Sequence, residues 1–117
     1  YMTREKITYY TEMIKNRQLN TELLISCLSN LEPRISKSAY LRAKFKNSGM
    51  MSNESHEYEM KRFMKYRTEI TNLLVSTYSK QDIKVLVSKV EKGDIVTNRI
   101  CDLVIELIHN TGDYHLM

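Results

Sequence analysis

Along most of the chain, apolar residues are distributed with the periodicity of an α-helix. Apolar residues recur at spacings of three and four, as on the buried face of an amphipathic helix. The pattern predicts an all-α fold: a compact bundle of about six helices in a single domain over residues 1–117. The predicted helices cover residues 4–17, 21–31, 37–46, 54–78, 80–91 and 95–110.

The last predicted helix, 95–110, has the widest apolar face in the chain. On a helical wheel its apolar residues span roughly 200°, whereas a surface helix typically has an apolar stripe only a little wider than 100°. Asp94 can cap its start, and Gly112 can follow its end in a left-handed conformation. We therefore expect this helix to be central, with neighbours on several sides.

Turn-forming residues indicate where other helices begin and end. Asn20 or Thr21 can start the second helix, and Ser79 can cap the fifth. Pro33 disfavours helical dihedral angles at the residue before it, so the second helix is expected to stop near Leu31.

Two segments have no helical pattern. Residues 47–53 are rich in Asn, Ser and Gly and predict a loop. Its Met50-Met51 pair either covers the edge of the core or offers an adaptable contact to a partner. Residues 112–117 are expected to form a short tail.

The distribution of charge along the chain is more informative about function than the overall composition. The chain has a net charge of +4, but the charge is unevenly distributed. Residues 34–67 contain nine Lys and Arg against three Glu, a net +6, whereas residues 68–117 contain five against seven, a net −2. The middle of the chain therefore predicts a basic surface.

Two aromatic residues are interleaved with these cations, a combination also found where proteins bind phosphates and stack on bases. We expect the basic surface at residues 34–67 to be the binding site for a partner. Its candidate residues are Arg34, Lys37, Tyr40, Arg42, Lys44, Phe45, Lys46, Lys61, Arg62 and Lys65. Arg67 differs because it projects from an apolar face, and an unpaired buried guanidinium is costly. We expect it to have a carboxylate partner or to lie at an interface.

The motifs of common catalytic sites are missing from the sequence. Three isolated glycines cannot form a phosphate-binding loop, and no Cys-x-x-Cys pair occurs. His56-Glu57 begins like a zinc-protease helix, but Met60 stands where the second ligand should be. We therefore predict a non-enzymatic protein with no catalytic residues, no cofactor and no metal.

Two observations bear on the compartment. Cys27 and Cys101 both fall on predicted apolar helix faces, which favours free buried thiols and a reducing environment over a disulfide. No apolar run is long enough to span a membrane, and the N-terminal residues lack the layout of a signal peptide. We expect an intracellular protein, cytoplasmic or nuclear, without a membrane partner.

These expectations combine into two hypotheses of function. The first is an α-helical binding module that acts in regulation or assembly through protein–protein contacts, with a partner that presents an acidic surface. The alternative is a protein that binds DNA or RNA through the same basic surface. Self-association through leftover apolar surface on the last helix, at Ile95 and Ile105, is a third and weaker hypothesis.

Overall fold

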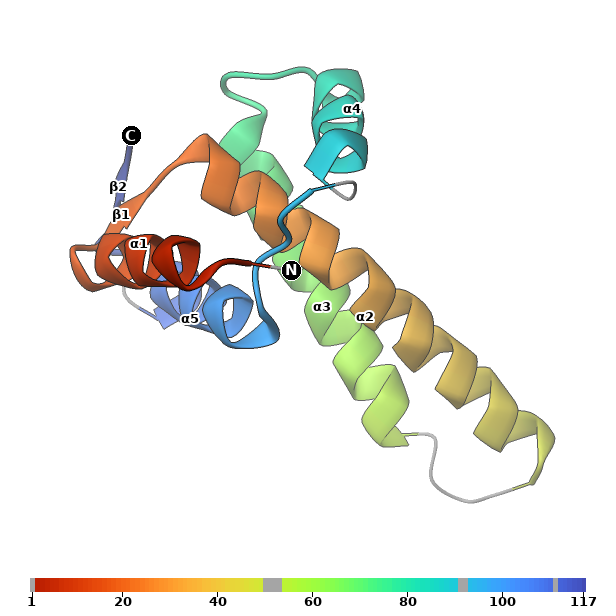
Figure 1. The fold of residues 1–117 in the computed structure, drawn as a ribbon. Helices are drawn as coiled ribbons and strands as arrows, with labels where there is room; N and C mark the ends of the chain where they lie inside the picture. Colours follow the sequence, from red (N-terminus) through yellow and green to blue (C-terminus); the bar gives the residue numbers. More distant parts are fainter. Residues whose placement is uncertain (1, 50–53, 91–92, 111) are drawn as a thin grey trace.

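The computed structural model describes residues 2–49, 54–90, 93–110 and 112–117. These residues form five helices and two very short strands, which confirms the all-α fold class but not the count of about six helices. Two of the helices form a hairpin that extends from one end of the molecule (Figure 1), and the whole measures 48 × 28 × 28 Å. The elements are α1 (Arg4–Lys15), β1 (Gln18–Leu19), α2 (Thr21–Asn47), α3 (Glu54–Leu74), α4 (Lys80–Val90), α5 (Asn98–Asn110) and β2 (His115–Leu116).

Helix α2 accounts for the difference in helix number. The predicted helices 21–31 and 37–46 are one continuous helix that runs through Pro33. The prediction that the helix stops near Leu31 was wrong because tertiary packing outweighs the cost of an interior proline, about 3 kcal/mol. Ile35 and Ser38 are buried beyond the proline, as Leu31 is before it, so both halves of α2 have neighbours to pack against.

The N-terminal half of α2, and not the last helix, is the most enclosed element. Every residue from Leu23 to Leu31 is buried, which requires neighbours all around the helix. Helix α5 buries one face through residues such as Ile100 and Val104, while Asp102 and Glu106 on its other side are exposed. The expectation that the last helix is central is therefore corrected: α5 is part of the core, and α2 lies at its centre.

The ends of the other helices follow their capping residues. Thr97, not Asp94, caps α5, because its hydroxyl accepts a hydrogen bond from the backbone N–H of Ile100 at 3.2 Å. Helix α5 consequently begins at Asn98 and not near residue 95. Ser79 caps α4 as predicted, since its hydroxyl accepts from the N–H of Asp82 at 3.1 Å. Helix α3 ends at Leu74, four residues before the predicted end at residue 78, because residues 75–77 form a turn ahead of Ser79.

The C-terminal residues are not a free tail. Strand β2 pairs in parallel with β1, with Gln18 opposite His115 and Leu19 opposite Leu116. The N–H of Met117 donates to the carbonyl of Leu19 at 2.8 Å, and Leu19 itself is fully buried. Two residues on each side are too few for a strand to be recognised from an alternating pattern.

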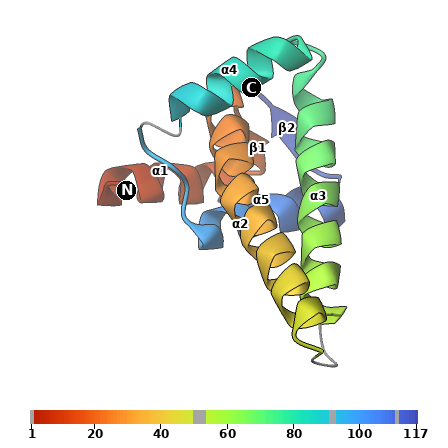
Figure 2. The ribbon, with the colours of Figure 1, turned by 90° about the vertical axis from the view of Figure 1, so that its right-hand side faces the viewer.

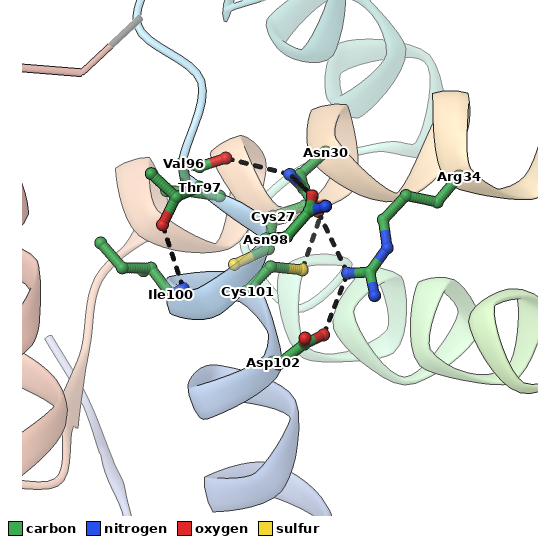
Figure 3. A network of polar contacts seen from close by, with 9 residues as sticks. All are labelled: Cys27, Asn30, Arg34, Val96, Thr97, Asn98, Ile100, Cys101 and Asp102. Carbon is green, nitrogen blue, oxygen red and sulfur yellow. Dashed lines mark hydrogen bonds and ion pairs between the residues drawn. The ribbon is translucent and has the colours of Figure 1, made fainter.

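A buried polar network joins the centre of α2 to the start of α5 (Figure 3). The Nδ2 atom of Asn30 donates to the carbonyl oxygen of Val96 at 3.0 Å and to Oδ1 of Asn98 at 2.9 Å. Beside this network lie Cys27 and Cys101, which are both buried and free, as predicted. The hydrogen bond with the neighbouring Cys101 thiol and burial both raise the pKa of Cys27 well above its ordinary value, so this thiol stays protonated at neutral pH.

Replacing Asn30 tests how much this network stabilises the fold. Asn30→Ala leaves the buried carbonyl of Val96 without its donor, so we expect the free energy of unfolding to fall by about 1–3 kcal/mol. Urea denaturation followed by circular dichroism measures the change. The matched control is Asn72→Ala on the exposed side of α3, expected to change stability by less than about 0.5 kcal/mol. Equal effects of the two substitutions would contradict the assignment.

Candidate binding surface

The predicted basic surface lies mainly on the projecting end of the α2–α3 hairpin. Helices α2 and α3 run side by side away from the end of the molecule that holds α1, α5 and the two strands (Figure 2). Residues 36–47 of α2 and 54–65 of α3 form this end, which we call the hairpin tip. The 27 residues of α2 alone extend about 40 Å. The hairpin thus brings together cations that lie on either side of residues 48–53 in the sequence. The predicted loop at residues 47–53 is described only in part: Asn47 ends α2, and the Met50-Met51 pair lies outside the described residues.

Four cations on α2 remain available at the hairpin tip. Lys37, Lys44 and Lys46 are exposed and Arg42 is half-buried. No ion pair involves any of them among the residues that the structure describes. Helical spacing places Lys37 and Lys44 on one flank of α2 and Arg42 and Lys46 on the other.

The two aromatic candidates on α2 have different environments. Tyr40 is 65% exposed, so its ring is free to contact a partner. Phe45 is half-buried and stacks on the His56 ring of α3, with the ring centroids 5.2 Å apart and the planes nearly parallel. Phe45 therefore holds the hairpin tip together and is less available for stacking on a ligand.

Arg34 is half-buried and engaged by neighbouring elements, so it is not part of a free basic surface. Its Nη1 atom lies 3.0 Å from Oδ1 of Asp102 on α5 and 3.4 Å from Oδ1 of Asn30. Its guanidinium carbon also lies 4.3 Å from the centroid of the Phe63 ring, a cation–π contact (Figure 3 shows the polar partners). These contacts neutralise Arg34 and make it a poor candidate for binding a partner.

The three candidates on α3 also differ from one another. Lys65 is exposed without an ion pair in the described parts of the chain, whereas Lys61 lies 3.3 Å from the carboxylate of Glu57. Arg62 is half-buried, and its guanidinium lies over the rings of Tyr58 and Phe63 at 5.8 and 5.1 Å. Arg62 Nε is buried without a hydrogen-bond partner.

Arg67 has the carboxylate partner that its position in the sequence predicts. Its Nη1 atom donates to Oε1 of Glu32 on α2 at 2.9 Å. Glu32 directly precedes Pro33, so this ion pair ties the least helix-favouring position of α2 to α3. Both side chains are partly exposed, so the pair is worth at most about 1 kcal/mol.

Within the hairpin tip itself, the acidic residues lie on α3. Glu54, Glu57 and Glu59 occupy its first turns, while residues 36–47 of α2 contain no acid. The surface is therefore basic along α2 and mixed in charge along α3.

Periodicity could have identified one further exposed residue. Tyr58 is 66% exposed and lies three and seven residues before Lys61 and Lys65, on the same outer face of α3. His109 of α5 also lies near this face, with its ring 6.2 Å from that of Tyr66, but a residue so distant in the sequence could not have been placed there beforehand.

Two other expectations concern metals and self-association. Within the described ranges, no group of three or more His, Cys, Asp or Glu side chains could hold a metal ion. Ile105, named for self-association, is buried in the core and so cannot form that contact; Ile95 is half-buried.

Comparisons of the chain with protein families, with curated proteins and with solved structures gave no match. Among the described helices, none has the length and apolar character needed to cross a bilayer. The class that fold and surface define is an all-α protein with a projecting, basic helical hairpin.

A double-mutant cycle tests whether Arg34 stabilises the fold through Asp102, in contrast to the unpaired cations of α2. Because Arg34 pairs with Asp102, we expect Arg34→Ala and Asp102→Ala to be non-additive in urea denaturation, with a coupling energy of about 0.5–1 kcal/mol. The control is Lys37→Ala on the same flank of α2, which should change stability by less than about 0.5 kcal/mol and should not couple to Asp102. Full additivity of Arg34 and Asp102 would contradict the structural role.

Proposed function

We propose that the protein is a non-enzymatic, intracellular binding module that acts in regulation or assembly by contacting an acidic protein surface with its hairpin tip. The observation that carries the proposal is the set of cations on α2, Lys37, Arg42, Lys44 and Lys46, which have no ion pair in the described residues. Elsewhere on the hairpin, Arg34 and Arg67 are each neutralised by an acid. Cations that the fold leaves unused, on a segment that projects from the core, are suited to steering an oppositely charged partner.

The acids on α3 favour a protein partner over a nucleic acid. Glu54, Glu57 and Glu59 lie at the same end of the hairpin as the α2 cations. A phosphate backbone is uniformly negative and would be repelled where it passed these carboxylates. A protein surface can place acids opposite α2 and basic or neutral groups opposite α3.

One feature supports nucleic-acid binding as the second candidate function. Tyr40 lies three residues after Lys37 and four before Lys44, and its ring is exposed. An aromatic ring between two lysines can stack on a base while the lysines contact the phosphates on either side.

Charge reversal at the hairpin tip tests both functions. We expect Lys44→Glu with Lys46→Glu to weaken binding of a fluorescently labelled polyglutamate peptide at least about tenfold, because two attractive contacts become repulsive. Fluorescence anisotropy at two salt concentrations measures the affinity. The matched control, Lys84→Glu with Lys89→Glu, reverses two exposed lysines of α4 and should bind like the unchanged protein.

The same titration with mixed-sequence DNA and RNA discriminates between the two candidates. Nucleic-acid binding through this surface would be steeply salt-dependent, and the double variant would reduce the slope of log affinity against log salt by about 2 for duplex DNA. Tight nucleic-acid binding with that loss of slope would replace the proposed function by the second candidate. No binding of either probe at low salt would exclude both.

A further inference from the structure

A hollow on the side of the hairpin facing α5 is lined only by side chains that can donate hydrogen bonds. It has a volume of about 290 Å³ and is formed by Tyr58, Lys61, Arg62, Lys65, Tyr66 and His109. The first five come from α3 and the last from α5. No carboxylate lines this hollow, although the chain as a whole has nearly as many acids as basic residues.

Arg62 is the central group because its donors are unused. Its guanidinium is held over two aromatic rings, and no hydrogen bond or ion pair joins it to the described residues. A second hollow of about 350 Å³ adjoins on the α5 side, where Arg62 is accompanied by Asp102 and Glu106. Asp102 is engaged by Arg34, and neither acid bonds to Arg62. Burial of Nε without an acceptor costs free energy, and an anion in the hollow would find the Nη groups of the same guanidinium without a partner in the described residues.

Among the described residues, two acids form ion pairs with side chains that line the first hollow. Glu57 pairs with Lys61, and Glu69 lies 3.7 Å from Nδ1 of His109. Neither Lys65 nor Arg62 forms an ion pair with the described residues. A planar guanidinium fork can bind two oxygens of a phosphate or of a carboxylate, and the additional ammonium group matches the second negative charge, which a phosphate monoester has and a carboxylate lacks.

We propose that this hollow binds the dianion of a phosphate monoester, with Arg62 donating to two of its oxygens and Lys65 compensating its remaining charge. Tyr58 and Tyr66 flank the position of the group that carries the phosphate. The hollow is smaller than most drug-sized ligand sites, which suits one phosphate and part of its carrier. The proposed phosphate site lies in this hollow between α3 and α5 and does not involve the α2 lysines on which the proposed function rests.

Nuclear magnetic resonance of the arginine side chains tests the proposal directly. In the ¹⁵N-labelled protein, we expect the Nε–H resonance of Arg62 to shift saturably on titration with inorganic phosphate, phosphoserine or adenosine monophosphate. Serine, adenosine and acetate should leave it unchanged. A stronger response to phosphoserine than to the nucleotide assigns the phosphate to a protein side chain, and the reverse assigns it to a nucleotide. An Nε–H resonance that stays fixed with every phosphate probe overturns the proposal.

Two substitutions of Arg62 test whether this side chain binds the phosphate specifically or only contributes to the net charge. Arg62→Gln should weaken phosphate binding roughly tenfold or more, because a charge-assisted pair of hydrogen bonds is lost. Arg62→Lys should recover part of the affinity, since it keeps the charge but not the fork. The matched control is Arg99→Gln, at an exposed arginine of α5, which should bind as tightly as the unchanged protein. Unaltered affinity in Arg62→Gln overturns the proposal, and the Nε–H titration of the unchanged protein decides alone if that variant does not fold.

Discussion

The packing of α2 against α3 on both sides of Pro33 is the interaction on which the rest of the structure depends. An interior proline removes one backbone hydrogen bond and crowds the preceding turn, which by itself favours a break. Here the residues before it are buried in the core, and Ile35 and Ser38 after it are buried as well. The Glu32–Arg67 ion pair adds a lateral tie at the position that proline disfavours most. A continuous α2 is what carries residues 36–47 out to the hairpin tip.

The same packing divides the basic residues by their position along the hairpin. The arginines near the body of the molecule, Arg34 and Arg67, reach across to acids on neighbouring elements, and Arg34 also lies over an aromatic ring. The cations farther out on α2, Lys37, Arg42 and Lys44, have no ion pair in the described chain. A planar guanidinium suits fixed and partly buried pairs such as that of Arg34, whereas a strongly hydrated ammonium is stable in solvent. The net charge of the sequence therefore overstates the charge that is available for binding.

Much of the fold could be predicted from local pattern, and the failures have a common cause. Caps such as Ser79, the apolar faces of α3 and α5, and the acid partner of Arg67 all follow from short-range spacing and from the cost of burial. The predicted break at Pro33 was wrong because the residues whose packing offsets the cost of the proline belong to α3, a helix more than twenty positions away. The docking of residues 115–117 on β1 could not be foreseen either, since a two-residue pairing has no periodicity. Within the site, spacing located the cations but could not show that Arg34 is engaged by Asp102.

Arg62 shows how a polar group without a hydrogen-bond partner can indicate a binding site. Arg34 and Arg67 each donate through Nη1 to an acid within the fold, so replacing them should mainly cost stability. Arg62 is held in place by the rings of Tyr58 and Phe63, yet its Nε remains buried without an acceptor. Cation–π contact compensates the charge in part but provides no acceptor for the N–H groups. Arg62 lines two adjoining hollows: Asp102 and Glu106 line one of them without bonding to Arg62, and no carboxylate lines the other. The hollow without a carboxylate is therefore the side on which we propose that Arg62 meets an anion from outside the chain.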